Sequence, residues 1–406
     1  MVSNGLSQSN RNPTDFLREE YEALVDQELD WRLRTLQGPS TTRCIVDGKE
    51  VLMLCSNNYL GLSTHPKLKD AAIKSIKKYG VGSGSVRSIA GNMDLHIELE
   101  ERLAKFKNAE ASLMYTSGFT ANSGLIPQLV GKEDIIISDE LNHGSIIDGV
   151  RLSVAERAIY KHRDVADLEK VLNEAENHDP PYRRILIITD GVFSMDGDIA
   201  PLDEIVEEAE KHGAMVYVDD AHGEAVLGDG GRGIVSHFHL DHTRVHVEMG
   251  TFSKAFGVIG GHISGSRDLI NFAYNKSRTW LLTASHPPPV VAACIAAIDV
   301  LEKEPQHVKT LWDNTNYFKK GLLDLGFNIG NSETPIMPVI IGENAVAKEF
   351  SQKLYDEGVF ALPIIFPMVP KGYARIRTIM NSALTEQDLD DALSAFEKVG
   401  KELQVI

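Results

Sequence analysis

The chain has few cysteines, no long apolar run and no excess of basic charge. Its three cysteines, Cys44, Cys55 and Cys294, are widely spaced and form no CxxC pair, so we expect neither a disulfide framework nor a metal site. No apolar run approaches the roughly 18 residues that a membrane span needs. The first residues, MVSNGLSQSNRNP, contain no apolar signal core. These absences predict a cytoplasmic protein that does not bind membranes.

Acidic residues outnumber basic ones. The chain has 58 Asp and Glu against 41 Lys and Arg, which gives a formal net charge of −17. A field of this sign repels nucleic acid and anionic membranes, so we expect neither as a partner. A site for an anion such as coenzyme A (CoA) would need its own local group of basic residues. The 406 residues, 43% of them apolar, are enough for two or three domains.

The N-terminal part reads as an arm, a helix and a hairpin. Residues 1–13 are polar, as in a disordered arm. The spacing of apolar residues predicts an amphipathic helix over 14–36. A hairpin is predicted over 44–54, with Asp47-Gly48 as its tight turn.

From about residue 65 the pattern changes to α/β. Short β-branched runs alternate with helical stretches, which predicts a mostly parallel sheet covered on both faces by helices. Ligands bind beyond the carboxyl ends of such strands. The predicted strands are 135–138, 185–189, 215–218 and 245–250, and the predicted helices include 95–106, 202–212 and 290–301. The last helix follows three prolines and begins a smaller α+β unit.

We therefore divide the chain into three parts. Residues 1–60 form an N-terminal arm and small segment, residues 61–289 a large cofactor-binding domain, and residues 290–406 a small C-terminal domain.

Two of the predicted strands end in residues that suit a pyridine cofactor. The strand over 215–218 is followed by Asp219-Asp220-Ala221-His222, and a carboxylate there favours a protonated ring nitrogen. The strand over 245–250 is followed by Thr251-Phe252-Ser253-Lys254, in which hydroxyls bind phosphate and a desolvated lysine forms an imine. The same residues also occur in helix caps, in surface loops and around solvated lysines. Neither motif alone therefore establishes a cofactor site.

Two weaker motifs complete this set. Gly118 and Phe119 begin a helical stretch after Thr116-Ser117, where free backbone N–H groups attract an anion. The alternative is an ordinary helix cap. His143 follows the strand over 135–138 and suits stacking on a flat ring, although a lone histidine is usually structural. Together the four motifs supply the parts of a pyridoxal phosphate (PLP) site.

Seven ordered stretches resemble the α-oxoamine synthases, the acyl-CoA-dependent branch of fold-type I PLP enzymes. The resemblance runs from about residue 30 to the end. The stretches are SNNYLGL at 56–62, GSGSVR at 82–87, SDELNHGS at 138–145, TDGVFSMDGD at 189–198, DDAH at 219–222, TFSKA at 251–255 and ARIR at 374–377.

This resemblance implies a role for each matching residue. The cofactor contacts it implies are the imine with Lys254, Asp219 at the ring nitrogen, His222 and Ser194 at the ring hydroxyl, His143 stacked on the ring, and Gly118, Phe119 and Thr251 at the phosphate. Lys254 is also the base that takes the α-proton. Arg377 holds the substrate carboxylate. Asn57 lines the active site, in relatives from the other subunit of a homodimer with shared sites.

Three stretches depart from the family pattern. Phe-Ser-Thr-Ser before the prolines is replaced by Leu-Thr-Ala-Ser, which introduces Ala284 and leaves Thr283 as the candidate for the neighbouring subunit's phosphate. Arg-Pro-Phe is replaced by a stretch that ends in Trp280, and Ala-Ala-His by one that ends in Leu384. These changes point to an altered acyl or amino-acid pocket.

The implied activity is condensation of a small amino acid with an acyl-CoA, with release of CoA. Glycine and acetyl-CoA are favoured, because the stretch at 86–91 is similar to that of members that accept small substrates. The closest alternative is alanine with pimeloyl-CoA, the 8-amino-7-oxononanoate synthase reaction of biotin synthesis. An aminotransferase or a lyase on the same fold is a further alternative. A PLP-binding protein without catalysis is disfavoured by the presence of Lys254, Asp219 and His143.

Overall fold

The β-branched runs form one seven-stranded sheet in the computed structural model, which describes residues 12–27, 29–31 and 33–406. All four predicted runs are strands, and β10 alone runs against the others, so the mostly parallel sheet is confirmed. In spatial order the strands are β4 (Ala111–Tyr115), β10 (Gly261–Gly265), β9 (Val247–Thr251), β8 (Met215–Asp219), β7 (Ile185–Asp190), β5 (Ile135–Asp139) and β6 (Glu156–Tyr160).

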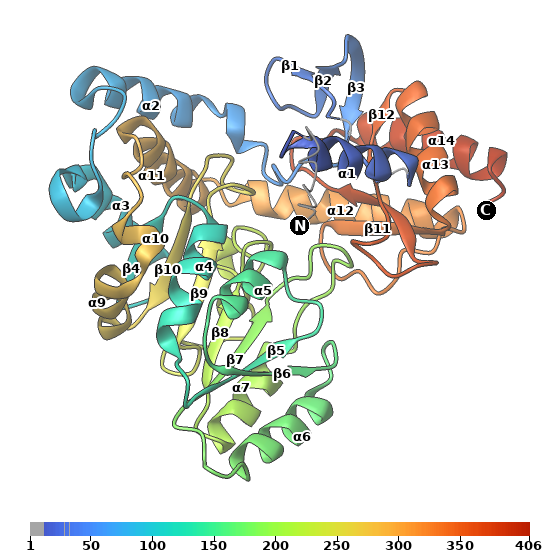
Figure 1. The fold of residues 1–406 in the computed structure, drawn as a ribbon. Coiled ribbons are helices and arrows are strands. Elements are labelled where there is room, and N and C mark those ends of the chain that lie inside the picture. Colours follow the sequence, from blue (N-terminus) through green and yellow to red (C-terminus); the bar gives the residue numbers. More distant parts are fainter. Residues whose placement is uncertain (1–11, 28, 32) are drawn as a thin grey trace, which may run out of the picture.

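Helices cover both faces of this sheet (Figure 1). Successive side chains of a strand point to opposite faces, so Ile135 and Ile137 belong to one core and Ile136 to the other. The first core contains residues of α3 (Asp94–Phe106), α6 (Val165–Glu176), α7 (Leu202–Lys211) and α11 (Pro288–Lys303). The second contains residues of α4 (Gly118–Leu129), α5 (Gly144–Arg151) and α9 (Arg267–Lys276).

The three predicted helices are confirmed as α3, α7 and α11. The last begins at Pro288, where proline is tolerated because the first helical N–H has no partner within the helix. The remaining elements of this part are η1 (Leu62–Thr64), α2 (Pro66–Tyr79), η2 (Arg87–Gly91), η3 (Asp229–Gly231), α8 (Ile234–His237) and α10 (Arg278–Leu281). Within the described residues, no helix combines the length and the apolar character that crossing a lipid bilayer requires.

The predicted N-terminal helix over 14–36 is too long. Helix α1 (Asp15–Asp26) ends ten residues earlier, and β1 (Leu36–Gln37) is extended. The backbone of Thr35 instead exchanges hydrogen bonds with Asp47, whose carboxylate accepts the N–H of Thr35 at 2.7 Å and whose own N–H donates to its carbonyl at 2.9 Å. Most of the predicted arm, residues 1–11, lies outside the described residues.

The predicted hairpin is confirmed as β2 (Arg43–Val46) and β3 (Lys49–Met53). Asp47 and Gly48 have φ of 49° and 81°, the two positive values that a two-residue hairpin turn of type I′ requires.

The C-terminal part closes on this hairpin. Strand β12 (Val359–Phe360) pairs in parallel with β3, so the first and third sequence segments share one small sheet. A second small sheet has the order β11 (Ile336–Gly342), β14 (Ala374–Ile379), β13 (Leu362–Ile364), and the helices are α12 (Gln306–Asp324), α13 (Asn344–Asp356) and α14 (Glu386–Glu402). The three-part division stays a proposal, with the first and third parts joined by β3 and β12.

Candidate active site

Four neighbouring parallel strands end at one edge of the large sheet. Asp139 ends β5, Asp190 ends β7, Asp219 ends β8 and Thr251 ends β9. The candidate residues His143, His222 and Lys254 follow these strands within a few positions. They therefore lie at the carboxyl edge of the sheet, the place where open α/β sheets bind ligands.

The carboxylate of Asp219 is buried and held at both oxygens. Asn122 donates its side-chain N–H to Oδ2 at 2.7 Å, and the backbone N–H of Ala221 donates to Oδ1 at 3.0 Å. Asn122 is itself fixed by the hydroxyl of Tyr217, which donates to its Oδ1 at 2.7 Å. Asp219 is thus an oriented acceptor that suits a protonated ring nitrogen.

Lys254 stands on a tight turn directly after β9. The turn is closed by the N–H of Gly257, which donates to the carbonyl of Lys254 at 2.9 Å. Gly257 has φ +69°, and a Cβ there would lie 2.3 Å from the backbone N of Ser63, so only glycine fits. Burial lowers the pKa of Lys254 to about 8, against the opposing charges of Asp219 and Asp190. Its amine is therefore available as a nucleophile near neutral pH.

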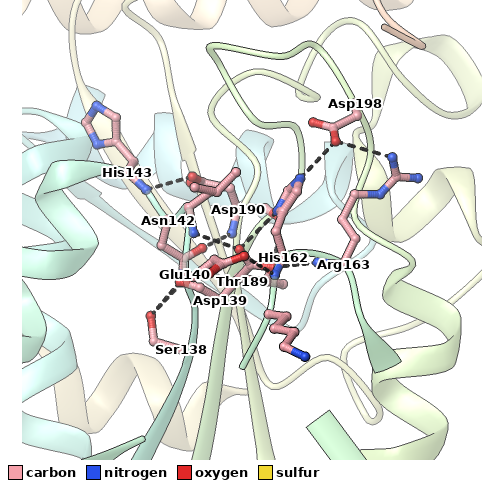
Figure 2. A network of polar contacts seen from close by, with 12 residues as sticks. Ser138, Asp139, Glu140, Asn142, His143, His162, Arg163, Thr189, Asp190 and Asp198 are labelled. Carbon is pink, nitrogen blue, oxygen red and sulfur yellow. Dashed lines mark hydrogen bonds and ion pairs between the residues drawn. The ribbon is translucent and has the colours of Figure 1, made fainter. Parts of the chain in front are cut away.

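His143 caps α5 and has a fixed ring. Its Nδ1 lies 2.7 Å from the hydroxyl of Ser145, and its backbone N–H donates to Asp190 Oδ2 at 2.7 Å (Figure 2). The ring points away from the buried polar network below it (Figure 2). Burial lowers the pKa of His143, and the charges of Asp219 and Lys254 also act on it. His143 is a neutral, oriented ring that suits stacking.

His222 reaches the site from the turn after β8. Its Nδ1 lies 2.8 Å from the hydroxyl of Tyr59, and the two rings meet edge to face. Burial lowers the pKa of His222 well below its usual range, with the charges of Lys254 and Arg377 adding to the effect. The imidazole is therefore neutral and can exchange a hydrogen bond with a ring hydroxyl.

Arg377 comes from β14 and crosses to the large sheet. Its guanidinium donates to the carbonyl of Ser194 at 3.1 Å. The same positive charge lowers the pKa of Lys254 and of His222, so Arg377 acts electrostatically on both. The side-chain oxygen of Asn57, two residues before Tyr59, is buried and has no hydrogen-bond partner among the described residues, as expected for a group that meets a bound molecule.

The start of α4 forms an anion cradle. The hydroxyl of Ser117 accepts the N–H of Thr120 at 3.1 Å, which leaves the N–H groups of Gly118 and Phe119 without a partner in the described chain. A Cβ added at Gly118 would lie 3.8 Å from that of Thr251, so the cradle faces the end of β9. Free amides at a helix N-terminus suit a phosphate.

Two candidate phosphate ligands have other contacts. The hydroxyl of Thr251 donates to the carbonyl of Gly260 at 2.6 Å, so its proton is already used. Thr283 lines a small cavity of about 20 Å³ with Thr116, and none of its described contacts reaches Lys254. Its neighbour Ala284 pairs with Val86.

Two of the residues that depart from the family pattern, Leu384 and Trp280, are packed in or against the hydrophobic cores. Leu384 is buried at 4% exposure within the main core. Trp280 lies under the guanidinium of Arg87, 5.6 Å from the ring centre, and its indole N–H is buried without a partner in the described chain.

A buried polar network supports the site from below (Figure 2). His162 lies 3.1 Å from Asp139 Oδ1 through Nδ1 and 2.9 Å from Asp198 Oδ2 through Nε2. Burial opposes a charge on this ring, but the hydrogen bonds to the two carboxylates outweigh burial and raise the pKa of His162 to about 9. Arg163 adds a second cation, 3.3 Å from Asp198.

Sequence reasoning assigned no role to several residues that the fold brings to the site. Tyr59 lies inside the stretch at 56–62 that carries the family resemblance. Asn122 lies in the helix that begins at Gly118, where a polar residue among apolar ones was the available signal. His162 carries no such signal, since a lone histidine after a strand is common. Its two carboxylate partners are distant in sequence and only the fold brings them together.

The residues fit PLP by the tests that the chain itself offers. An amine with a lowered pKa, an oriented carboxylate, a neutral ring and a pair of unpartnered amides match the aldehyde, ring nitrogen, ring face and phosphate of this cofactor.

Comparison with known proteins agrees with a PLP site. Residues 49–396 match the family model described as aminotransferase class I and II. Two curated relatives are named 8-amino-7-oxononanoate synthase. One, from Symbiobacterium thermophilum, is 56% identical over 97% of this chain and 99% of its own length. The other, from Thermoanaerobacter pseudethanolicus, is 55% identical over 97% and 98%.

A solved structure has a closely similar fold. It is a serine palmitoyltransferase variant from S. paucimobilis with bound PLP–myriocin, and it superimposes with a TM-score of 0.90 at 30% identity. The match covers 98% of this chain and 100% of that one.

Proposed function

The chain belongs to the aminotransferase class I and II family, and from this premise we propose that it is an 8-amino-7-oxononanoate synthase, which joins alanine to pimeloyl-CoA. It is a PLP-dependent acyltransferase of the α-oxoamine synthase type. The observation that carries the substrate proposal is the identity of 55–56% to two enzymes of that name over nearly their full length. These relatives favour alanine and pimeloyl-CoA over the glycine and acetyl-CoA that the sequence motifs favoured.

We propose that the residues at the sheet edge divide the work as the family resemblance implies. Lys254 attaches the cofactor and later takes the α-proton of the amino acid. Asp219, held by Asn122 and Ala221, keeps the ring nitrogen protonated. When bound, PLP supplies an electron sink for the negative charge that develops at the α-carbon.

The surrounding residues position the cofactor and the amino acid. His143 packs on the ring face, and His222 meets the ring hydroxyl, with Ser194 nearby. Arg377 pairs with the substrate carboxylate, since within the described residues its guanidinium donates only to the carbonyl of Ser194 and its other N–H groups can bind an anion. Holding the substrate in this geometry lowers the entropic cost of reaction.

The cradle and the remaining polar groups hold the ends of the cofactor. Gly118 and Phe119 donate their free N–H groups to the phosphate. Thr251 joins them only if its hydroxyl leaves the carbonyl of Gly260. Thr283 serves a phosphate in the neighbouring subunit, and Asn57 completes the substrate side.

A homodimer with shared sites is part of the proposal. Helix α1 has no buried residue, and its apolar face is open in the single chain. The exposed side chains are Phe16, Leu17, Tyr21, Leu24 and Val25. Exposed apolar residues gathered on one helix face mark a contact surface, which supports a second copy as its partner. Sedimentation velocity measures the oligomeric state, and a monomer at micromolar concentration would contradict the proposed homodimer.

The substrate proposal is tested by a matrix of amino acids and acyl-CoAs. Purified PLP-loaded enzyme is given alanine, glycine or serine with pimeloyl-, acetyl- or palmitoyl-CoA, and free CoA thiol is measured. We expect the highest kcat/KM for alanine with pimeloyl-CoA, with CO2 released in step with CoA. A preference for glycine and acetyl-CoA would overturn it. Lys254→Ala is the matched inactive control, and CoA release that survives this substitution would remove the proposed chemistry.

A further inference from the structure

His162 lies between two buried carboxylates but belongs to no group assigned to the reaction. It follows β6, and its two ring nitrogens face Asp139 Oδ1 at 3.1 Å and Asp198 Oδ2 at 2.9 Å (Figure 2). The side chains of Asp139 and Asp198 are 1% and 7% exposed. Two carboxylates at this depth need compensating positive charge: His162 faces both, and Arg163 adds a second cation 3.3 Å from Asp198.

One of these carboxylates shapes the turn that delivers His143. Asp139 Oδ1 accepts the N–H of Leu141 at 2.9 Å, and its Oδ2 accepts the N–H of Arg163 at 3.0 Å. His143 follows two residues after Leu141. The position of the stacking ring thus depends on the orientation of the Asp139 carboxylate.

The residue that carries the other carboxylate, Asp198, closes the loop that anchors Arg377 through its backbone. The carbonyl of Asp198 accepts the N–H of Phe193 at 3.1 Å, and the ring of Phe193 meets that of His162 edge to face at 4.3 Å. The next residue, Ser194, supplies the carbonyl that accepts the guanidinium of Arg377. The side chain of His162 therefore contacts the supports of both His143 and Arg377, and its neighbour Arg163 meets Asp139 through its backbone N–H and Asp198 through its guanidinium.

A doubly protonated imidazole suits this position and a neutral side chain does not. The imidazolium donates from both nitrogens, one to each carboxylate. A glutamine in its place would donate to one carboxylate and turn its own oxygen toward the other. The raised pKa of His162, about 9, supports a protonated ring at neutral pH.

We propose that His162 is a positioning residue, which as a cation bridges Asp139 and Asp198 and so sets the affinity of the site for the carboxylate of the amino-acid substrate. The step from the bridge to the substrate rests on the proposed function, because it takes Arg377 as the carboxylate ligand and His143 as the stacking ring.

The experiment compares His162→Gln, Asp198→Asn, the double variant and His178→Gln, all loaded with PLP. His178 is the matched control, since it is an exposed histidine that stacks on Tyr182 away from the site. Hydrogen–deuterium exchange reads the N–H groups of Phe193 and Gly197, which are bonded within the loop. The change of cofactor absorbance on titration with L-alanine reads substrate affinity.

We expect His162→Gln to raise exchange at Phe193 and Gly197 and to weaken L-alanine binding by about tenfold, as the loss of one charged hydrogen bond would. The KM for alanine should rise more than kcat falls. The double variant should be no weaker than the worse single variant, because both remove one bridge. His178→Gln should match the wild type.

Unchanged exchange and unchanged alanine affinity in His162→Gln would overturn the proposal. Exchange that rises throughout the protein while KM and kcat stay constant would also overturn it, since His162 would then only stabilise the fold. If no amino acid changes the absorbance of the wild type, the proposed function fails. The exchange measurement then still decides whether His162 holds the 193–198 loop.

Discussion

The side-chain N–H of Asn122 donates to Asp219 Oδ2 at 2.7 Å, which connects α4 to the end of β8. The same helix begins with the free amides of Gly118 and Phe119. One rigid element therefore orients the groups for the phosphate and the group for the ring nitrogen. Tyr217, on the same strand as Asp219, completes the arrangement by donating its hydroxyl to Asn122.

Asn122→Ala should reduce kcat by about tenfold while the cofactor stays bound. The substitution removes the hydrogen bond that the charged carboxylate of Asp219 accepts, and such a bond is worth roughly 1.5–3 kcal/mol. The measurement is steady-state CoA release together with the visible absorbance of the bound cofactor. Asn173→Ala, on the exposed face of α6, is the control. Equal kcat for the two variants would show that Asp219 needs no support from α4.

Covalent attachment of PLP to the apoenzyme should speed up as pH rises through about 8. The pKa of Lys254 is lowered from 10.5 to about 8 by burial, so the neutral amine predominates above that pH. Stopped-flow absorbance from pH 6 to 10 measures the rate. A midpoint near 10, as for an exposed lysine, would contradict a desolvated amine.

Sequence reasoning located the site edge because strand runs and their polar ends are local signals. The strands before Asp219 and Lys254 were visible as β-branched runs, and Asp47-Gly48 was visible as a turn because few residues accept positive φ. The helix over 14–36 was extended too far, since its apolar spacing holds only as far as Val25. Pairing of β1 with β2 then decides the local structure, and such pairing is not a local property.

The partners of the site residues were beyond sequence reasoning for a different reason. Tyr59 and His222 are 163 positions apart, and their 2.8 Å contact depends on how two segments cross. Substrate choice was also out of reach, because Trp280 and Leu384 differ from the family pattern without a local rule that links them to an acyl group. Overall identity to the relatives was the more informative signal.

The stability of the protein should fall between about pH 6.5 and 9 through His162. Its pKa is raised in the folded state, so the bridge to Asp139 and Asp198, beside Arg163, stabilises fully below the unfolded pKa and is lost as pH rises through about 9. The loss is of the order of 3 kcal/mol. Urea unfolding of the wild type and of His162→Gln at several pH values in this range gives the free energy of unfolding at each pH. An equal fall in this free energy with pH for the two proteins would refute the prediction.

Lys107→Met should destabilise the fold by about 3–5 kcal/mol, because it leaves buried carboxylates without their cation. The side chain of Lys107 is 1% exposed, and its amine lies 2.6 Å from Glu248, 3.5 Å from Glu224 and 3.6 Å from Asp220. The exposed Lys105→Met should change stability by under about 0.5 kcal/mol. Urea denaturation compares the two. Similar midpoints would mean that the carboxylates take up protons instead.

The pairing of β3 with β12 orders events during synthesis. The hairpin leaves the ribosome early, but its parallel neighbour at residues 359–360 is among the last segments made. Until then one edge of β3 has no strand beside it, and contacts of such long separation form slowly. The large sheet, whose strands all lie before residue 266, can form first. A nascent chain stalled before residue 359 should therefore contain the ordered seven-stranded sheet, while β3 keeps an unpaired edge to which chaperones can bind.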